Sequence, residues 1–378
     1  MTEKKNGVLF IIFSLGNGGT ERMMMNVLNK CELPHNDKIL YLYSYIDNNS
    51  YEKLLNSNIT IYKHPRTQKK YKHFVQISKL IKIIKNHNVE TIVCFSSKSA
   101  LLAVIIKKIF FFKKIKVISR LGAFFLKQYS DTKNMIKYHF WTHVTLHFSY
   151  RYSDKVICLT NAMKNDLVSK SEKLFDKIVI INNYIDTDRI ELALKNPLPV
   201  KYQNYFIAVG RLEKQKNYFG LIEAFNIIKD EIKENLLILG DGGHKTILED
   251  YINQIQCSNR IKLLGFKENP YKYISNANFY ILNSYFEGMS NSLLEAMICK
   301  IPIIVTNHPG VEDVITNEKN GLIVPMGDDA TLAKTIVRLS NDKELQSNLA
   351  KASFKSAVRF TNTIEKYSEL IDELRDNK

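Results

Sequence analysis

Cysteine is scarce in this 378-residue sequence, and its spacing excludes a disulfide framework. The five cysteines are odd in number and widely separated, and no two form a C-x-x-C motif. Most of them stand in apolar runs, which is typical of reduced, buried thiols. We therefore expect a cytosolic protein. The positions are Cys31, Cys94, Cys158, Cys257 and Cys299.

Long apolar runs are also lacking. No uninterrupted apolar stretch approaches the roughly 18 residues that a membrane-spanning helix needs. The first twenty residues mimic a secretion signal, because two lysines precede an apolar run. That run is short, no small-x-small cleavage site follows it, and it ends in a glycine cluster before a helical pattern. A buried first strand is the expectation here.

Acidic residues are almost absent from one part of the chain. Residues 61–127 contain 16 lysines and arginines but a single acid, Glu90. Residues 1–200 hold 32 basic and 15 acidic side chains, whereas residues 201–378 hold 22 and 23. The excess charge of +16 therefore belongs to the N-terminal half, where an anionic partner or surface would bind. A hydrophobic content of 45% excludes disorder for most of the chain.

The sequence is rich in short apolar runs that alternate with longer helix-patterned segments. Such alternation predicts α/β folding, with parallel strands covered by helices on both faces. A proline-marked polar stretch, Asn196–Asn204, divides two series of this kind. We predict two doubly wound Rossmann-like domains facing a cleft, residues 1–196 and 197–358. The helix within 359–378 is expected to pack back toward the first domain.

The predicted elements are as follows. Strands are expected at Val8–Ser14, Ile39–Tyr43, Ile59–Tyr62, Thr91–Phe95, Lys116–Ser119, Lys155–Leu159, Ile178–Asn182, Tyr205–Val209, Leu236–Leu239, Ile261–Leu264, Phe279–Leu282, Ile303–Val305 and Leu322–Val324. Helices are expected at Glu21–Lys30, Phe74–Lys85, Ala100–Ile109, Met135–Tyr150, 217–231, 244–256, 270–275, 291–299, 310–316, 330–340 and Thr361–Arg375.

Glycine-rich turns follow two of the predicted strands. The first, over 16–22 (GNGGTER), puts Gly18 and Gly19 before a helix whose free N–H groups could meet an anion. A dinucleotide fingerprint fails there, because Glu21 stands where a small residue is needed. Contact with a phosphate and a plain turn capped by Thr20 both remain open. For the second turn, 240–243 (GDGG), an ordinary strand exit is favoured.

A basic pair follows the first strand of the second domain. Arg211 and Lys216 stand on either side of a turn at the carboxyl end of that strand, just before a helix. Arginine offers a planar fork and lysine a point charge, so the pair suits a diphosphate. The alternative is a solvated charged loop. The position at a strand's carboxyl end is what favours the binding interpretation.

Two glutamates eight positions apart flank the start of a later helix. The spacing alone carries almost no information, because three such pairs occur in the chain. Glu287 lies in a glycine-containing loop after an apolar strand, where a carboxylate can accept hydrogen bonds from hydroxyl groups. Glu295 has a structural explanation as well, since Ser292-x-x-Glu295 has the form of a capping box.

At this point the residues resemble a known family. Residues 205–325 carry FIAVGRLEKQKN, LILGDGG, LLGF, NSYFEGMSNSLLEAM and EKNGLIVP in order, and the N-terminal part carries FSLGNGGTER. These motifs are similar to those of the retaining GT-B glycosyltransferases of family 4, especially bacterial enzymes that build lipid-linked glycans. The resemblance spans most of the chain.

The resemblance implies roles for the motif residues. Arg211 and Lys216 match the basic pair that holds the donor diphosphate and stabilises the departing nucleotide. Glu287 matches the first glutamate of the family's E-x7-E motif, which holds the donor sugar, and Glu295 matches the second, which meets the ribose. The other implied donor-site residues are Gly288, Met289 and Ser290 beside the sugar, Gly18 and Gly19 under the phosphates, and Gly265 and Phe266 at the base.

One departure from the family matters. Many members carry a histidine after a strand in the middle of the first domain, in the region that aligns with Val117–Phe124. This sequence has no histidine there, and the best-aligned position is Leu121, beside Arg120. A catalytic histidine is therefore not transferred. Arg120 could contact an anionic acceptor or the donor, but a surface arginine is the favoured interpretation.

No metal or other cofactor is expected. The nine histidines form no H-x-x-H motif, and Asp186-Thr187-Asp188, although a D-x-D triplet, lies near the linker rather than at a strand end. His139, His143 and His147 fall on one face of a predicted helix with no carboxylate or cysteine nearby. For these three histidines, packing is favoured over metal binding.

The resemblance and the charge together predict a metal-independent hexosyl- or N-acetylhexosaminyltransferase. It would move a sugar from a UDP-linked donor to a polyprenyl-diphosphate-linked glycan in bacterial polysaccharide synthesis. The segments 69–85 and 100–120 mix lysines with apolar residues, so we expect peripheral binding to the anionic inner face of the cell membrane. Covering helices with extended lysine stems are the structural alternative.

Two other functions remain open at this stage. One is a glycosyltransferase of the same fold with a soluble acceptor. The other, of a different class, is a basic nucleic-acid-binding or scaffold protein with a degenerate cleft. Nucleic acid is not expected as a partner, because no nucleic-acid-binding motif accompanies the basic charge.

Overall fold

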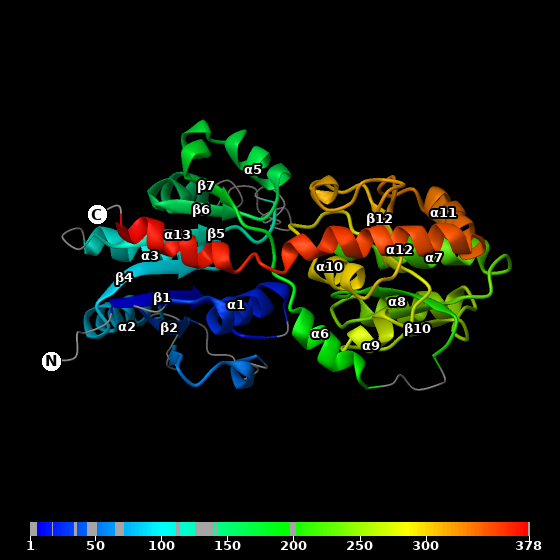
Figure 1. Cartoon of the computed structure of the whole chain (residues 1–378), viewed down its shortest axis with the longest axis horizontal. Helices are drawn as coiled ribbons and strands as arrows, with labels where there is room; N and C mark the ends of the chain where they lie inside the picture. Colours follow the sequence, from blue (N-terminus) through cyan, green and yellow to red (C-terminus); the bar gives the residue numbers. More distant parts are fainter. Residues whose placement is uncertain are drawn as a thin grey trace. The chain divides into compact units, whose positions relative to one another are not determined.

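The computed structural model divides the chain into two compact units (Figure 1). The N-terminal unit comprises Met1–Tyr184 together with Asn362–Lys378, and the C-terminal unit comprises Ile185–Thr361. The chain thus passes into the second unit ahead of the predicted linker, since α6 (Thr187–Leu194) belongs to the C-terminal unit. The residues described are 6–16, 18–33, 36–43, 51–64, 72–110, 114–124, 140, 143–196 and 202–376.

The N-terminal unit is built on a seven-stranded parallel sheet of order β3-β2-β1-β4-β5-β6-β7. Successive strands run outward from β1 in one direction and then, from β4, in the other. The order therefore reverses between β1 and β4, which makes their carboxyl ends the expected ligand edge. The strands are β1 Asn6–Ile12, β2 Asn36–Leu42, β3 Thr60–Lys63, β4 Val89–Cys94, β5 Lys116–Arg120, β6 Lys155–Cys158 and β7 Ile178–Ile180.

Helices cover the N-terminal sheet. The apolar face of α13 joins α1 and the strands in one buried cluster, to which Tyr367, Leu370 and Ile371 of α13 contribute. The segment after residue 361 therefore completes the core of the first unit. The helices are α1 Gly19–Lys30, α2 Lys72–Asn86, α3 Ser97–Ile109, the π-helix η4 Val144–Tyr150, α5 Asn161–Val168 and α13 Glu365–Asp376, with short 3-10 turns η1 Glu52–Leu54 and η5 Glu172–Lys177.

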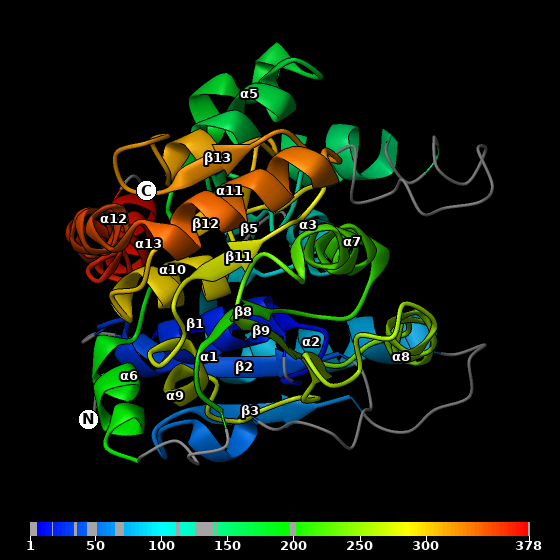
Figure 2. The ribbon, with the colours of Figure 1, turned by 90° about the vertical axis from the view of Figure 1, so that its right-hand side faces the viewer.

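The C-terminal unit repeats the design with a six-stranded parallel sheet of order β10-β9-β8-β11-β12-β13. Here the order reverses between β8 and β11. The strands are β8 Tyr205–Val209, β9 Asn235–Leu239, β10 Ile261–Leu263, β11 Tyr280–Leu282, β12 Ile303–Thr306 and β13 Leu322–Val324. Figure 2 shows helices on both faces of this sheet, with α7 and α11 on one side and α10 and α12 on the other.

The remaining elements of this unit are its helices and three short 3-10 turns. They are the 3-10 turns η6 Lys214–Lys216, η7 Val311–Asp313 and η8 Val358–Phe360, and the helices α7 Tyr218–Ile228, α8 Lys245–Gln254, α9 Tyr271–Ile274, α10 Asn291–Ile298, α11 Asp329–Asn341 and α12 Lys343–Ala357.

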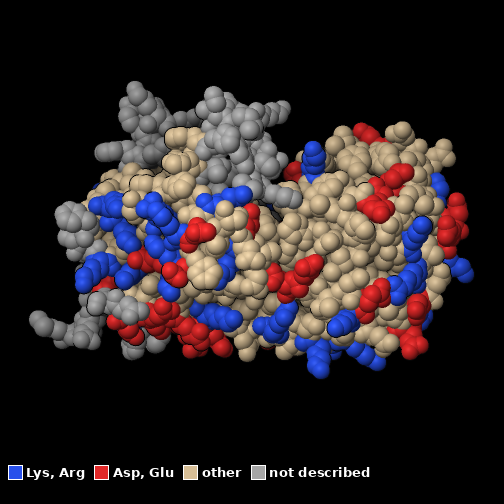
Figure 3. All heavy atoms as spheres, turned by 90° about the horizontal axis from the view of Figure 1, so that it is seen from above, with Lys and Arg blue, Asp and Glu red and all other residues tan. Residues whose placement is uncertain are grey.

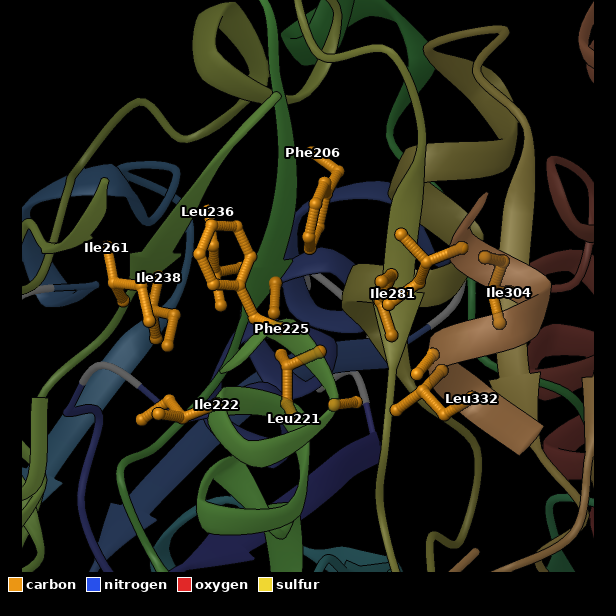
Figure 4. Packing of buried hydrophobic residues seen from close by; sticks show 14 of the residues in the cluster. Phe206, Leu221, Ile222, Phe225, Leu236, Ile238, Ile261, Ile281, Ile304 and Leu332 are labelled. Carbon is orange, nitrogen blue, oxygen red and sulfur yellow. The ribbon is translucent and has the colours of Figure 1, made fainter. Parts of the chain in front are cut away.

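Aromatic packing holds α7 against the second sheet. The rings of Phe206 in β8 and Phe279 are stacked with centroids 5.0 Å apart. The ring of Phe225 in α7 lies 5.9 Å from that of Phe206, and Figure 4 labels both residues in the packed cluster. All three side chains are fully buried. Because each buried ring contributes about 1.5–3 kcal/mol, this cluster fixes the position of β8 and of the loop that follows it.

The structure confirms the predicted fold class of parallel α/β sheets with Rossmann-like winding. A detail of the turn alternative that was left open after the first strand was wrong. Thr20 does not cap α1: the N-cap is Gly18, and Thr20 lies inside the first turn. The five cysteines are buried and free, as expected from their apolar surroundings.

The surface carries both signs of charge. On the face seen in Figure 3, lysine and arginine side chains gather on the N-terminal unit, with acidic side chains beside them. Among the described residues, no helix combines the length and apolar character needed to cross a membrane. His139 lies outside the described residues, while the exposed rings of His143 and His147 have centroids 4.5 Å apart.

Candidate functional site

The sequence-predicted donor residues of the C-terminal unit lie at the carboxyl edge of its sheet, most of them where the strand order reverses. Arg211 and Lys216 follow β8, and Glu287 follows β11, which pairs with β8. Gly265 and Phe266 follow β10 at the same carboxyl edge. Parallel sheets bind ligands at such a reversal, so the topology alone gathers these residues.

Lys216 and Glu287 form an ion pair. The Lys216 Nζ lies 2.7 Å from the Glu287 Oε1, and the side chains are only 12% and 10% exposed. The contact has the distance of an ion pair without the alignment of a hydrogen bond. Burial opposes ionisation of Glu287, but the Lys216 ammonium outweighs it, with help from Ser284 and His308, and holds the pKa of the carboxyl below its ordinary value.

Two glycines allow the Lys216 side chain to reach this position. A Cβ at Gly210 would lie 2.9 Å from the Lys216 Cε and 3.1 Å from the Tyr218 hydroxyl, so only glycine lets the lysine lie over the strand end. Gly240 has a φ of +145°, and a Cβ there would overlap the Gly210 carbonyl oxygen. The glycine turn after β9 is therefore a close backbone contact that supports the basic loop.

Hydrogen bonds tie the loop after β8 to the loop after β11. The Gln215 side chain donates to the Phe286 carbonyl at 2.7 Å, and the Tyr285 N–H donates back to the Gln215 carbonyl at 2.9 Å. The Asn283 amide donates to the Asn217 carbonyl at 3.1 Å. These bonds fix the two loops relative to each other, and with them the cation and the carboxylate.

Asn217 and His308 are site residues that sequence reasoning missed. Asn217 has a left-handed φ of +45°, and its side chain accepts a hydrogen bond from the Gly220 N–H at the start of α7. His308 follows β12, is buried, and acts on the pKa of Glu287. A histidine two residues past a strand's carboxyl end was a signal in the sequence that could have identified it.

The capping box predicted for α10 was wrong. The N-cap is Ser290, whose hydroxyl accepts from the Leu293 N–H at 3.4 Å. Ser292 instead donates to the Val209 carbonyl at 3.0 Å and accepts from the Tyr280 hydroxyl at 2.8 Å. Glu295 is buried in α10 and has no capping role to explain it.

The remaining predicted donor residues differ in exposure. Gly288, Met289 and Ser290 are buried directly after Glu287. Arg211 is exposed, and its guanidinium makes no hydrogen bond or ion pair with a described residue. Phe266 has 46% of its surface exposed, which is a large fraction for an aromatic residue. Gly265 has a φ of +70° and open space where a side chain would stand.

Gly18 and Gly19 belong to the N-terminal unit, at the carboxyl end of β1. They form the N-cap and first residue of α1. The carboxylate of Glu21 folds back against Gly18, as the N3 glutamate of a capping box does. The start of this helix therefore already attracts a negative group.

Arg120 is not a surface residue, contrary to the prediction. It ends β5 with only 2% of its surface exposed, because Phe95 and Asn183 cover it. The Asp186-Thr187-Asp188 triplet, which the sequence reasoning had discounted, has a structural role: Asp186 caps α6 by accepting from the Arg189 N–H. Among the described residues, no cluster of three metal-ligating side chains occurs.

Comparison with family models identifies the chain. Residues 18–189 match the model Glycosyltransferase Family 4, and residues 190–356 match the model Glycosyl transferases group 1. The two models together cover nearly the whole chain in the order expected from the motifs. The chain belongs to the glycosyltransferases that these two models describe. It is therefore a glycosyltransferase with a GT-B fold.

Individual relatives agree with this assignment. An uncharacterized glycosyltransferase of Methanocaldococcus jannaschii is 31% identical over 46% of this chain and 45% of its own length. A Campylobacter jejuni enzyme, N-acetylgalactosamine-N,N'-diacetylbacillosaminyl-diphospho-undecaprenol 4-alpha-N-acetylgalactosaminyltransferase, is 27% identical over 91% of this chain and 94% of its own. Anabaena HepE, solved with UDP and glucose, superposes with a TM-score of 0.80 at 16% identity, over 99% and 100% of the two chains.

Proposed function

We propose that this glycosyltransferase moves a sugar from a UDP-linked donor to a glycan carried on a polyprenyl diphosphate. The observation that carries the proposal is the combination of an exposed Arg211 with the buried Lys216–Glu287 pair at one strand-order reversal. The Campylobacter relative's name describes a diphospho-undecaprenol acceptor, and the Anabaena structure was solved with UDP. Both support these substrate classes.

The chemistry requires positive charge at the leaving group. The bond between the sugar C1 and the β-phosphate oxygen breaks, and the acceptor hydroxyl oxygen bonds to C1. Negative charge grows on the diphosphate while the sugar ring becomes positive. Fixed cations in place before the reaction stabilise that developing charge without reorganising. Arg211 and Lys216 would supply this stabilisation, without a metal ion.

We infer retention of configuration for the transferred sugar. The acceptor hydroxyl would attack from the face that the diphosphate leaves, and its proton would pass to the leaving phosphate oxygen. This route needs no carboxylate nucleophile, in contrast to the paired carboxylates of retaining glycosidases. Glu287, held ionised by Lys216, would then accept hydrogen bonds from donor sugar hydroxyls.

Arg211→Ala is the sharpest test of the site, because the exposed Arg211 side chain has no described partner to lose. Folding should be unchanged, while the rate of UDP release in the presence of a UDP-sugar and acceptor that the wild type uses should fall by about 100-fold or more. Lys214→Ala, an exposed neighbour in η6, is the matched control and should keep wild-type kcat/KM. A wild-type rate in the Arg211 variant would contradict the assignment of Arg211 to the donor diphosphate.

We also propose that the N-terminal unit docks on the anionic inner face of the cell membrane. Residues 61–127, with 16 basic residues and one acid, support this. Co-sedimentation with phosphatidylglycerol vesicles should occur at low salt, weaken at high salt, and be absent with phosphatidylcholine. Equal binding to both vesicle types would contradict docking through anionic lipid, and binding to neither would favour a soluble acceptor.

A further inference from the structure

The N-terminal unit contains a buried arginine at its ligand edge. Arg120 is the last residue of β5, which pairs with β4 beside the reversal of strand order. Only 2% of its surface is exposed. Arginine is almost never fully buried unless its charge is paired, so the surroundings of this side chain need an explanation.

The contacts of Arg120 use part of its hydrogen-bonding capacity. Its Nη2 donates to the Asn183 Oδ1 at 2.6 Å, and its Cζ lies 5.1 Å from the centre of the Phe95 ring. Burial raises the pKa of the neighbouring Tyr367, and the Arg120 charge partly offsets this effect. Nε and Nη1 have no hydrogen-bond partner among the described residues. No carboxylate of a described residue forms an ion pair with Arg120.

The unused N–H groups lie close to the start of α1. A Cβ at Gly122 would lie 3.5 Å from the Thr20 Oγ1 and 3.9 Å from the Arg120 Nη1. Gly122 is exposed whereas Nη1 is covered, so an anion over this glycine would lie beside Nη1 and would bond to it after a small movement of the arginine. The N-terminus of the 12-residue helix α1 lies at the same edge, where the Glu21 carboxylate already faces Gly18 and offsets part of its positive dipole end.

The arrangement favours a ligand over a purely structural role. A buried cation without a counter-charge among the described residues is costly, and the fold gains from it one bond to Asn183 and contacts with the Phe95 ring and the Tyr367 hydroxyl. An apolar side chain at this position would avoid that cost. Within the described part of the chain the two donors have no partner, an anion would supply one, and a charge-assisted bond to phosphate is among the strong ones.

We propose that Arg120 is a substrate-binding residue that holds a diphosphate group over Gly122. The proposal rests on the proposed function only for the identity of that group, which could be the diphosphate of the nucleotide donor or that of the polyprenyl acceptor. It adds to that function a cation in the N-terminal unit, at the region where the family's histidine is absent.

The test measures binding to the full-length chain by calorimetry with three probes: inorganic pyrophosphate, UDP and farnesyl diphosphate. Arg120→Met and Gly122→Val, the latter keeping the arginine but filling the space above it, should both raise the Kd for at least one probe about 10- to 100-fold. Arg151→Met, an exposed arginine of the same unit, removes the same charge and should leave every Kd unchanged.

The pattern across probes identifies the substrate. Weakening confined to UDP assigns the donor, and weakening confined to farnesyl diphosphate assigns the acceptor; either outcome supports the proposal. Wild-type Kd values for all three probes in Arg120→Met would overturn it. If that variant does not fold, Arg120→Lys retains a charge without the planar fork and should weaken the same probe by a smaller factor. Because binding is measured without turnover, failure of the transfer assay leaves this result interpretable.

Discussion

Each of the two sheets of this glycosyltransferase has a largely buried cation at its carboxyl edge, and the two cations differ in whether a carboxylate neutralises them. At the edge of the C-terminal sheet, Lys216 lies 2.7 Å from a carboxylate that neutralises it. At the edge of the N-terminal sheet, Arg120 meets an amide, an aromatic ring and a hydroxyl, but no described carboxylate. The first cation is built into the fold, whereas the second costs the fold energy.

A further arginine shows how hydrogen bonds satisfy the guanidinium of an arginine with a purely structural role. Arg260 also stacks on a phenylalanine, with its Cζ 5.2 Å from the centre of the Phe225 ring. Its guanidinium, however, donates to three backbone carbonyls, those of Lys229, Ile232 and Glu234. Both arginines stack on a phenylalanine, so the contrast is that Arg120 keeps N–H donors without a hydrogen-bond partner among the described residues.

The largest effect is expected from separating Lys216 and Glu287. Lys216→Met leaves the Glu287 carboxylate buried without its cation, so the free energy of unfolding should fall by about 3–5 kcal/mol. Adding Glu287→Gln removes the stranded charge and should recover a large part of that loss. Urea unfolding of the two single variants and the double variant measures the coupling.

The control for this cycle is Lys214→Met, which removes an exposed ammonium from the same turn and should change stability little. If the losses of unfolding free energy in the two single variants simply added up in the double variant, the ion pair would contribute no coupling. Lys216 would then not be stabilised by Glu287, and the difference between the two sheets would not hold.

A smaller effect is expected from the two arginines. Arg260→Met loses hydrogen bonds to three carbonyls and should cost about 2–3 kcal/mol of unfolding free energy. Arg120→Met loses one bond and an uncompensated charge, and should stay within about 1 kcal/mol of the wild type or exceed it. Matching destabilisation of both variants in urea would show that Arg120 serves structure.

Most of the fold was predictable because its strands are nearly all apolar. The strands Tyr205–Val209 and Leu322–Val324 agree residue by residue with prediction, since asparagine, glycine or proline bounds each run. β1 begins at Asn6 rather than Val8. Asn6 and Gly7 join the sheet through backbone pairing with β2, which leaves no mark in a hydrophobicity pattern.

The site was predictable as far as strand ends determine it. The carboxyl-end rule placed Lys216 and Glu287 at one edge, but it could not show that they pair with each other. The capping prediction failed because Ser292 has a better partner in the Val209 carbonyl, 83 positions away. The burial of Arg120 depends on Asn183, 63 positions away, and a local sequence pattern does not record such a contact.

The return of the chain to its first unit has a consequence for protein synthesis. The core of the N-terminal unit includes Ile364, just before the final helix, and Tyr367, Leu370, Ile371 and Leu374 within it. Between Tyr184 and Asn362 the ribosome must add roughly 180 residues, which takes about 10–35 s at roughly 5–20 residues per second. During that interval the face of the first sheet that α1 covers still lacks its final helix, while the contiguous second unit can fold. The half of the enzyme that is translated first is thus the last to be completed.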